Sequence, residues 1–509
     1  GNGGAAGWFG NGGDGGAGVA SGAGGRGGDG GWFWGSGGTG GTGGDAADPG
    51  GDGGVGGQGG NASLLAIWGD GGAGGAGGAG AVAGDGQPRG LGGAGGAGGR
   101  GGLFGSAGTA GVAGPAGAVP AMYTAGWTTT VYQGLAEIIA AGADQNKIAV
   151  FDFDNTTQAR DVGEAALALT QQDNLVDPNS LSSSVFPPFR TIDGVPMSID
   201  QGVYDYYESV VATSGPDSQL DPFREYSSLS MVSTVYYGRP VSDFLAATSG
   251  AYDDGAGLAD LVTGEESKIL NAGRPFIYPQ MADLYGNLRA NGFDVWVVSA
   301  GITWAVRWMV QNALNPAIVA KYGEAAALPL DHVVGVTTLM KDTVTGELVS
   351  DYQLTHQIPD QAYINLDPTR MSQLEITAIP DGLSSWRGGK VGAIQNVITQ
   401  TGTTPGQSIY LAGGDSNGDL EMLATAEVRL TIDRMDKPAL VNYFANEIAQ
   451  YPDSVWLLQP TISSAPVGFL ETKCQMADKT SGNASMTTKT NNSLAILEPT
   501  GRLGSFLAC

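Results

Sequence analysis

The sequence predicts an α/β fold for residues 147–509, preceded by a glycine-rich domain of a different kind. Three apolar runs, at 148–151, 295–298 and 409–411, each end in polar residues, and helical patterns lie between them. Strands that alternate with helices are typical of a parallel sheet with helices on its faces. The composition changes sharply near residue 118, because most of the 88 glycines precede it.

The chain is strongly acidic, with a formal net charge of -26 over 509 residues. Such a charge repels nucleic acid and anionic membrane surfaces, so we expect no nucleic-acid partner. No apolar run approaches the length of a membrane span, so we expect no transmembrane segment. The sequence begins at Gly1 without a Met, and we expect a fragment or a processed product in which a missing signal peptide says little.

Residues 1–118 repeat with a period of three, in which two positions are often glycine. This period fits the polyproline II helix, and we expect packed polyglycine helices of this type with hydrogen bonds between their backbones. A flexible spacer is the alternative. Apolar clusters interrupt the repeat, and we expect small cores at the ends or turns of the helices, built from Trp8-Phe9, Trp32-Phe33-Trp34, Leu64-Leu65, Ile67-Trp68 and Leu103-Phe104.

This segment resembles the glycine-rich repeat region of the mycobacterial PE/PGRS proteins, on "GGAGGAGG" repeats broken by "GNGGDGG" and "GGWFWGSGG". The resemblance implies export to the cell envelope or surface, or secretion, and a partner in the envelope or on a host surface. It implies no chemistry. Residues 119–146 then connect the two parts through a predicted helix with Leu135, Ile138 and Ile139 on one face.

Two aspartates, Asp152 and Asp154, follow the first apolar run in "KIAVFDFDNTT". Because side chains alternate along a strand, both point the same way, and two like charges so close require a cation or a positive side chain. The second run ends at Ser299, and the third ends before Asp415 and Asp419. The carboxyl ends of parallel strands meet at one edge of a sheet, where we expect these side chains to gather.

Clustered carboxylates without histidine or cysteine suit a hard cation with oxygen ligands, and Mg²⁺ is the cation we expect. Mg²⁺ in such sites is usually bound together with a substrate phosphate, which also favours a fixed positive charge. Lys390, at the start of the helical pattern in "WRGGKVGAIQNVI", is the candidate for that charge.

Residues 147–437 resemble the haloacid-dehalogenase-like phosphatases, in the group that includes phosphoserine and phosphocholine phosphatases. Four motifs occur in the family's order: D-x-D-x-T at 152–156, Ser299-Ala300, Lys390, and G-D-S-x-x-D at 414–419. The resemblance implies a Rossmann-like core with a helical cap inserted after the first motif, at about residues 158–273.

The same resemblance implies a role for each matching residue. Asp152 would be the nucleophile that forms an aspartyl-phosphate, and Asp154 the general acid and then the base. Ser299 and Lys390 would hold the phosphoryl oxygens, with Thr156 and Ala300 also at the substrate. Mg²⁺ would bind Asp152, the carbonyl of Asp154, and Asp415, while Asp419 would support the metal or Lys390.

The cap is rich in tyrosine and acidic residues, and aromatic faces beside carboxylates favour a quaternary ammonium group. We expect Tyr206, Tyr207 and Glu208 to contact the substrate, a small phosphomonoester such as phosphocholine. The opening "DFDNTTQARDVGEAALA", with Asp161 and Glu164, resembles secreted bacterial phosphocholine phosphatases. The alternative is that most of the tyrosines only pack the cap: Tyr204, Tyr206, Tyr207, Tyr226, Tyr236, Tyr237 and Tyr252.

Two other functions compete with the phosphatase hypothesis. Ser416 lies in a G-x-S-x-G string, but a serine hydrolase of that type needs a later histidine, and the last one is His356. A surface interaction protein with an inert phosphatase-like domain stays as the alternative. Residues from about 453 to 509 are expected to form a C-terminal extension, polar after "VWLLQPT", that wraps the core and is tied down if Cys474 and Cys509 pair; the alternative is two free thiols.

Overall fold

The computed structural model describes the whole chain except residues 49, 64, 67, 82–89, 116, 192, 215–229, 254–273, 383–384, 386, 402–405, 407 and 465–466. The predictions for Leu64, Ile67 and Tyr226 lie outside the described residues. The chain divides into two compact units: residues 1–122 with 318–327, and residues 123–317 with 328–509. In the described part of the chain, no helix is long and apolar enough to cross a membrane.

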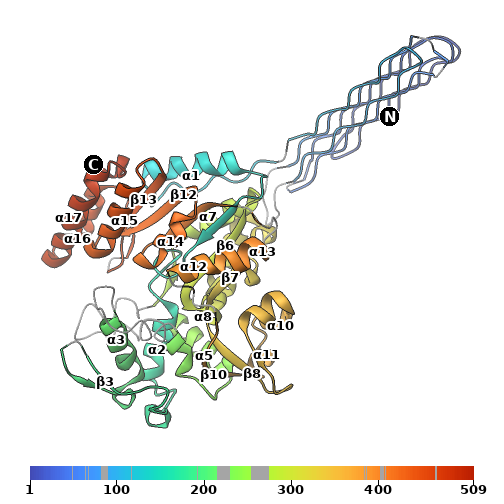
Figure 1. Cartoon of the computed structure of the whole chain (residues 1–509). Coiled ribbons are helices and arrows are strands. Elements are labelled where there is room, and N and C mark those ends of the chain that lie inside the picture. Colours follow the sequence, from blue (N-terminus) through green and yellow to red (C-terminus); the bar gives the residue numbers. More distant parts are fainter. Residues whose placement is uncertain are drawn as a thin grey trace. The chain divides into compact units, whose positions relative to one another are not determined.

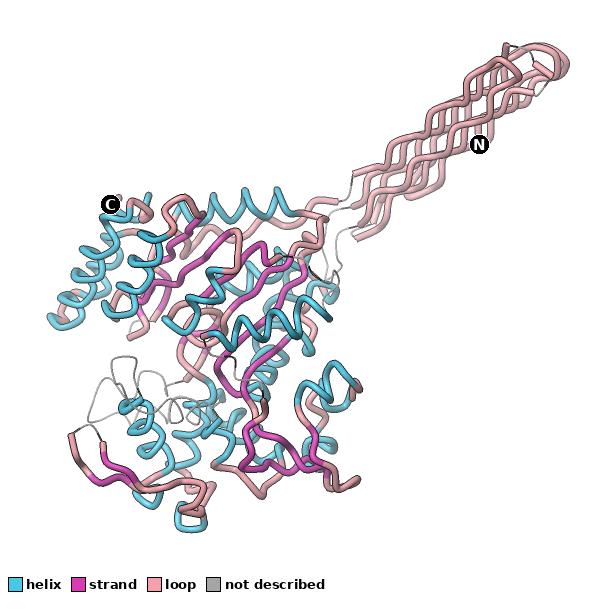
Figure 2. The backbone as a smooth tube through the Cα atoms, in the orientation of Figure 1, coloured by secondary structure: helices cyan, strands magenta, loops and turns pink. Residues whose placement is uncertain are grey.

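The glycine-rich unit consists of extended segments that run back and forth and pair through their backbones (Figure 2). Each segment pairs antiparallel with the one before it, as in the 2.8 Å bond from Gly57 N to Gly41 O. Segments that are two apart in the sequence also pair in parallel, as in the 2.8 Å bond from Gly56 N to Ala94 O. A Cβ on Gly57 would come within 2.0 Å of the Gly25 carbonyl oxygen, so the packing requires glycine there.

The apolar clusters of this unit lie at its turns but are not small cores, so that prediction is wrong. The turn at Trp8-Phe9 pairs with the turn at Trp32–Trp34, for example through Phe33 N and Trp8 O at 3.0 Å. Yet the Trp8, Trp32 and Trp68 side chains are 66%, 62% and 70% exposed. The physical reason is that the interior of the bundle is backbone and glycine, which leaves no apolar layer to cover the turns.

The core of the second unit is a mostly parallel sheet, as predicted (Figure 1). Its strands are β1 (Ile148–Phe151), β6 (Asp294–Ile302), β7 (Val333–Val336), β11 (Ile409–Gly414), β12 (Val428–Arg434), β13 (Val455–Ile462) and β14 (Gly468–Phe469). The order is β14-β13-β12-β11-β1-β6-β7, and only the β13–β14 pair is antiparallel. β1 lies between β6 and β11, where the order of the strands reverses, which is the usual ligand site of such sheets.

The helices of this unit alternate with its strands and cover the sheet. Apolar side chains from both kinds of element form one core; Val150, Trp296 and Phe444 are among its fully buried members. Burying a side chain of this size contributes about 1.5–3 kcal/mol. These helices are α1 (Thr129–Gly142), α7 (Pro279–Ala290), α8 (Thr303–Met309), α12 (Gly388–Ala393), α13 (Thr399–Thr401), α14 (Leu420–Ala424), α15 (Pro438–Gln450), α16 (Lys473–Thr480) and α17 (Ala484–Leu497). Most of α9 (Asn315–Tyr322) belongs to the first unit.

The helix expected within residues 119–146 is α1, which Thr128 caps through a bond from Val131 N. Leu135 and Ile139 are buried, whereas Ile138 is half-buried. Within the C-terminal extension, β13 is a buried strand between β12 and β14, so residues 455–462 belong to the core sheet. The Ser-, Thr- and Asn-rich composition that follows this strand obscured it, and α16 and α17 pack beyond it beside α15.

Cys474 and Cys509 form a disulfide with their Cα atoms 5.3 Å apart, which decides between the two alternatives. The bond closes a loop with a sequence separation of 35. In the chain-entropy account, such a loop is worth about 3–4 kcal/mol. We therefore expect the double substitution Cys474→Ser/Cys509→Ser to lower the free energy of unfolding by about this amount. Urea titrations followed by circular dichroism measure it, and identical midpoints for the two proteins would refute the estimate.

The insertion after the first motif forms a helical cap. Its base is a short antiparallel pair of β2 (Gln158–Ala159) and β5 (Phe276–Ile277). Above this pair, α2 (Val162–Gln172) packs against α3 (Val203–Ser214) and α5 (Val241–Asp253). A small hairpin of β3 (Phe189–Arg190) and β4 (Pro196–Met197) completes the described part of the insertion.

A second insertion, which the sequence analysis did not separate from the core, adds to the cap. It forms a sheet in the order β10-β8-β9 from β8 (Thr338–Asp342), β9 (Leu348–Val349) and β10 (Leu374–Pro380), with α10 (Gln361–Ile364) and α11 (Pro368–Ser372). Backbone bonds join β10 to the first insertion, from Gly238 N to Ile376 O at 2.8 Å and from Ile376 N to Arg239 O at 2.9 Å. Figure 1 shows these elements grouped around α5 and α8.

Candidate active site

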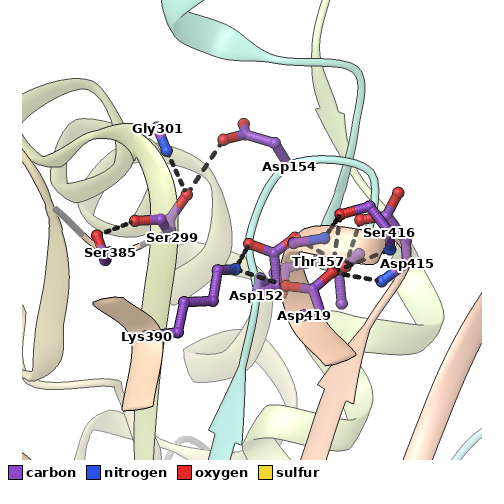
Figure 3. Close-up of polar contacts among 12 residues, drawn as sticks. Asp152, Asp154, Thr157, Ser299, Gly301, Ser385, Lys390, Asp415, Ser416 and Asp419 are labelled. Carbon is purple, nitrogen blue, oxygen red and sulfur yellow. Dashed lines mark hydrogen bonds and ion pairs between the residues drawn. The ribbon is translucent and has the colours of Figure 1, made fainter. Parts of the chain in front are cut away.

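Asp152 lies at the carboxyl end of β1, where its N–H continues the ladder to Gly413 O at 2.9 Å. Lys390 on α12 donates from Nζ to Asp152 Oδ1 at 2.5 Å and to Asp419 Oδ1 at 2.6 Å (Figure 3). All three side chains are buried. Burial opposes the charge of Lys390, but the two carboxylates raise its pKa above its ordinary value. The structure thus places the positive charge of Lys390 beside Asp152, as the sequence predicts.

The turn after β11 positions Asp415 beside Asp152. Asp419 Oδ2 accepts the backbone N–H groups of Asp415 and Ser416, each at 3.0 Å, and so fixes this turn. Thr156 Oγ1 lies 3.0 Å from Asp152 Oδ2 and 3.1 Å from Asp415 Oδ1, between the two carboxylates. Both Asp419 oxygens are therefore occupied by protein donors, which favours a supporting role for Asp419 over direct metal ligation.

Asp152, Asp415 and Asp419 form a buried acidic cluster in which each offers an oxygen within 4.8 Å of the others. Burial, with the charge of Asp419, raises the pKa of Asp152 to about 6, although Lys390 opposes the shift. Burial also raises the pKa of Asp415 well above its ordinary value, against the pull of Arg434, whose Nη2 lies 2.7 Å from Asp415 Oδ2. A bound divalent cation would reverse these shifts, and oxygen ligands of this kind fit Mg²⁺.

Asp154 is held on the other side of Asp152 (Figure 3). Its carboxyl group accepts hydrogen bonds from Gln158 Nε2 at 2.6 Å and from Ser299 Oγ at 3.2 Å. Burial, together with the charges of Asp161 and Asp152, raises the pKa of Asp154 well above its ordinary value. This environment favours a protonated carboxyl group, which is the form that a general acid needs.

Ser299 lies within β6, next to the half-buried Ala300. Its hydroxyl oxygen accepts the N–H of Gly301 at 2.9 Å, while Ser385 Oγ donates to the Ser299 carbonyl at 2.5 Å. The N-cap of α8 is Ile302. Ser299 therefore does not cap α8.

The cap contributes an acid–tyrosine cluster, which we define as Asp161, Glu164, Tyr204, Tyr207 and Glu208. Asp161 caps α2 by accepting the N–H groups of Gly163 and Glu164 at 2.7 and 3.0 Å. Tyr207 donates its hydroxyl to Glu164 Oε1 at 3.1 Å. Burial and the charges of Asp161, Glu208 and Asp154 raise the pKa of Glu164 well above its ordinary value. The cluster therefore lies within electrostatic reach of the general-acid candidate.

Tyr206, one of the predicted substrate contacts, does not join this cluster. Its hydroxyl donates to Pro187 O at 2.8 Å, and its ring packs edge-on against Phe186 and Phe189. Neighbouring residues on a helix point about 100° apart, so Tyr206 and Tyr207 cannot face the same site. Positions 204, 207 and 208 lie on one face of a helix, and this spacing could have indicated Tyr204 as the member of the cluster in place of Tyr206.

Three further residues of the site were not predicted from the sequence. Gln158 contacts Asp154, and Arg434 contacts Asp415. Thr157 Oγ1 donates to Asp152 O at 2.8 Å. Thr157 and Gln158 directly follow the D-x-D-x-T motif, so proximity in the sequence could have indicated them. Arg434 comes from β12, and only the order of the strands brings it to the site.

No protein-family model matches this chain. A phosphorylcholine phosphatase of Pseudomonas aeruginosa is 28% identical over 316 residues, which cover 61% of this chain and 81% of the relative. The chain is a homologue of a known phosphatase. This similarity supports the prediction that the chain is an enzyme of the phosphatase class.

Solved structures give weaker likenesses. A substrate-bound phosphoserine phosphatase aligns with a TM-score of 0.28 and 12% identity, over 56% of this chain and 86% of that one. An antifreeze protein of the springtail Granisotoma rainieri, a bundle of nine polyproline type II helices, aligns with a TM-score of 0.13 and 36% identity, over 23% of this chain and 94% of that one. At these TM-scores the likenesses carry no functional argument.

Proposed function

We propose that this chain is a Mg²⁺-dependent phosphatase of the haloacid-dehalogenase type that works through an aspartyl-phosphate and hydrolyses a small amine phosphomonoester, phosphocholine first. The observation that carries the proposal is the pairing of two aspartates with different surroundings. Asp152 is held against a buried lysine, and Asp154 is held among carboxylates. One aspartate is thus prepared to act as a nucleophile and the other as an acid.

The reaction has two steps. A carboxylate oxygen of Asp152 bonds to phosphorus while the bond from phosphorus to the ester oxygen breaks, and Asp154 gives its proton to the leaving alcohol. Asp154 then takes a proton from water, the water oxygen bonds to phosphorus, and the bond to Asp152 breaks. Lys390 and Ser299 would hold the phosphoryl oxygens throughout, since Lys390 contacts Asp152 and Ser299 contacts Asp154.

The acidic cluster fits Mg²⁺. The carboxylates of Asp152 and Asp415 would hold it with the backbone carbonyl of Asp154, while Asp419 keeps Lys390 and the β11 turn in place. When bound, Mg²⁺ supplies positive charge that stabilises the transferring phosphoryl group. Thr156 fixes the relative position of the two ligating carboxylates.

The choice of phosphocholine rests on the acid–tyrosine cluster. A quaternary ammonium group is attracted to aromatic faces and to carboxylates, and the cluster combines buried examples of both. The proposal is supported by the printed activity of the Pseudomonas aeruginosa relative. From the glycine-rich repeats alone we also propose export to the cell envelope or surface, or secretion, which fractionation of producing cells would test.

Phosphate release by the purified chain tests the proposed function. We expect release with MgCl₂ from p-nitrophenyl phosphate, phosphocholine, phosphoethanolamine and phosphoserine, with phosphocholine preferred. EDTA should abolish release, and excess MgCl₂ should restore it. Release from none of these substrates would favour a surface interaction protein with an inert domain, and release that resists EDTA would refute the metal.

Glu164→Gln tests the choice of substrate. The change removes one carboxylate from the acid–tyrosine cluster, and we expect about a 10-fold higher KM for phosphocholine with little change for p-nitrophenyl phosphate. Tyr206→Phe is the matched control, because its hydroxyl contacts Pro187 outside the cluster. Equal effects on both substrates would show that Glu164 has no role in selecting the amine.

A further inference from the structure

One end of the glycine-rich unit carries a group of exposed apolar side chains that the phosphatase does not use. We call it the aromatic tip, and its members are between 48% and 71% exposed: Trp8, Phe9, Trp32, Phe33, Trp34, Leu65, Trp68, Leu103 and Phe104. They lie on four turns, and their rings make contacts within two pairs of turns, with centroids 5.5 Å apart for Trp8–Phe33 and 5.4 Å for Trp68–Phe104. An apolar group of this size on a protein surface usually marks an interaction site.

Several backbone groups of the tip are hydrogen-bonded within the protein. Gly10 N donates to Trp34 O, Gly31 N to Gly10 O, and Trp32 N to Gly7 O, at 2.9 to 3.1 Å. A surface that stays in water has no need for such pairing, because water can satisfy exposed backbone groups. In hydrocarbon each unpaired backbone group costs several kcal/mol. These backbone groups of the tip would therefore keep their hydrogen bonds if the tip moved from water into lipid.

Behind the tip lies a belt of polar side chains bound to the neighbouring backbone. Asn11 accepts from Ser36 N, Asp29 from Asn61 N, and Asp70 from Ser106 N, at 2.7 to 2.9 Å. The turns at 7–10, 31–35 and 101–105 contain no charged residue. An apolar end bounded by a polar belt is the pattern of proteins that insert shallowly into the interface of a bilayer, where tryptophan is favoured.

We propose that the aromatic tip inserts into the interfacial layer of an uncharged lipid surface. Charge argues against an anionic surface, because the unit has more aspartates than arginines and Arg26 is paired with Asp29 at 2.8 Å. Chemistry argues against a sugar: a hollow of about 300 Å³ beside the rings is lined by Ala6, Gly7, Trp8 and Trp32, which offer no hydroxyl, amide or carboxylate side chain to a sugar hydroxyl. The inference does not depend on the proposed phosphatase activity.

Vesicle binding by the full chain tests the proposal. We expect the chain to sediment with vesicles of phosphatidylcholine, and bromine-labelled acyl chains to quench its tryptophan fluorescence. Added phosphatidylserine should not strengthen binding, and raising NaCl from about 0.05 to about 0.5 M should not weaken it. The triple variant Trp8→Ser/Trp32→Ser/Trp68→Ser should bind at least about 10-fold more weakly.

The control is Val19→Ser/Val112→Ser, which changes two valines that are 81% and 72% exposed outside the tip and should bind as the unsubstituted chain does. Glu164→Gln should also bind normally, which excludes recognition of the choline headgroup by the cap. Failure to sediment, absence of quenching, or binding only to anionic vesicles would overturn the proposal. So would lipid-free self-association that the triple variant loses, since a second copy would then cover the tip. The quenching measurement uses the unsubstituted chain and holds even if the triple variant fails to fold.

Discussion

Asp152→Asn is expected to lower kcat by at least about 10⁴-fold on every substrate that the chain hydrolyses. An amide cannot form the acyl phosphate, so the change removes the intermediate and not only an interaction. The fold should persist, because Lys390 keeps its bond to Asp419 and the asparagine has nearly the same shape. Phosphate release at saturating substrate measures the loss.

Asp367→Asn is the matched control for this change. Asp367 caps α11 by accepting the N–H of Arg370 at 3.0 Å, away from the site, and asparagine caps a helix equally well. We expect this variant to keep its activity and its urea midpoint. If Asp152→Asn retained most of the activity, Asp152 would not be the nucleophile.

Asp154→Asn is expected to lower the steady-state rate by about 10²–10⁴-fold, with a different signature. Protonation of the leaving group and activation of water both depend on this carboxyl group. p-Nitrophenolate leaves without a proton, so the first step with p-nitrophenyl phosphate should stay comparatively fast while the second step slows. A burst of p-nitrophenol that matches the enzyme concentration, followed by slow turnover, is the expected record in a stopped-flow experiment.

Equal slowing of both steps in Asp154→Asn, with no burst, would contradict the assigned role. Gln158→Leu offers a comparison, because it removes the 2.6 Å hydrogen bond to Asp154 and leaves the carboxyl group in place. A smaller loss than that of Asp154→Asn is expected, since Gln158 acts by positioning.

The residues of the site were predictable where a short sequence motif coincided with the end of a strand. Asp152, Asp415 and Asp419 follow β1 and β11, and these strands are recognisable as apolar runs. The sequence order alone could not supply Arg434, because it reaches Asp415 only through the pairing of β12 with β11.

The cap was predicted less completely than the core. Its place after the first motif was expected. The choice between Tyr204 and Tyr206 depends on how α3 is rotated about its axis, because these two side chains point to nearly opposite sides of the helix. The contribution of β8–β10 could not be predicted, because it depends on contacts between segments more than 100 residues apart in the sequence. The exposure of the aromatic turns was not predicted either, because the period of three does not show whether other side chains cover the turns.

The mass of the chain after acid quenching, during turnover of phosphocholine with MgCl₂, tests whether an aspartyl-phosphate forms at Asp152. We expect a fraction of chains heavier by one phosphoryl group, a larger fraction in Asp154→Asn, and removal of the group by hydroxylamine from a peptide that contains Asp152. Turnover without any such species in either protein, or a phosphoryl group on another residue, would contradict an aspartyl-phosphate mechanism at Asp152.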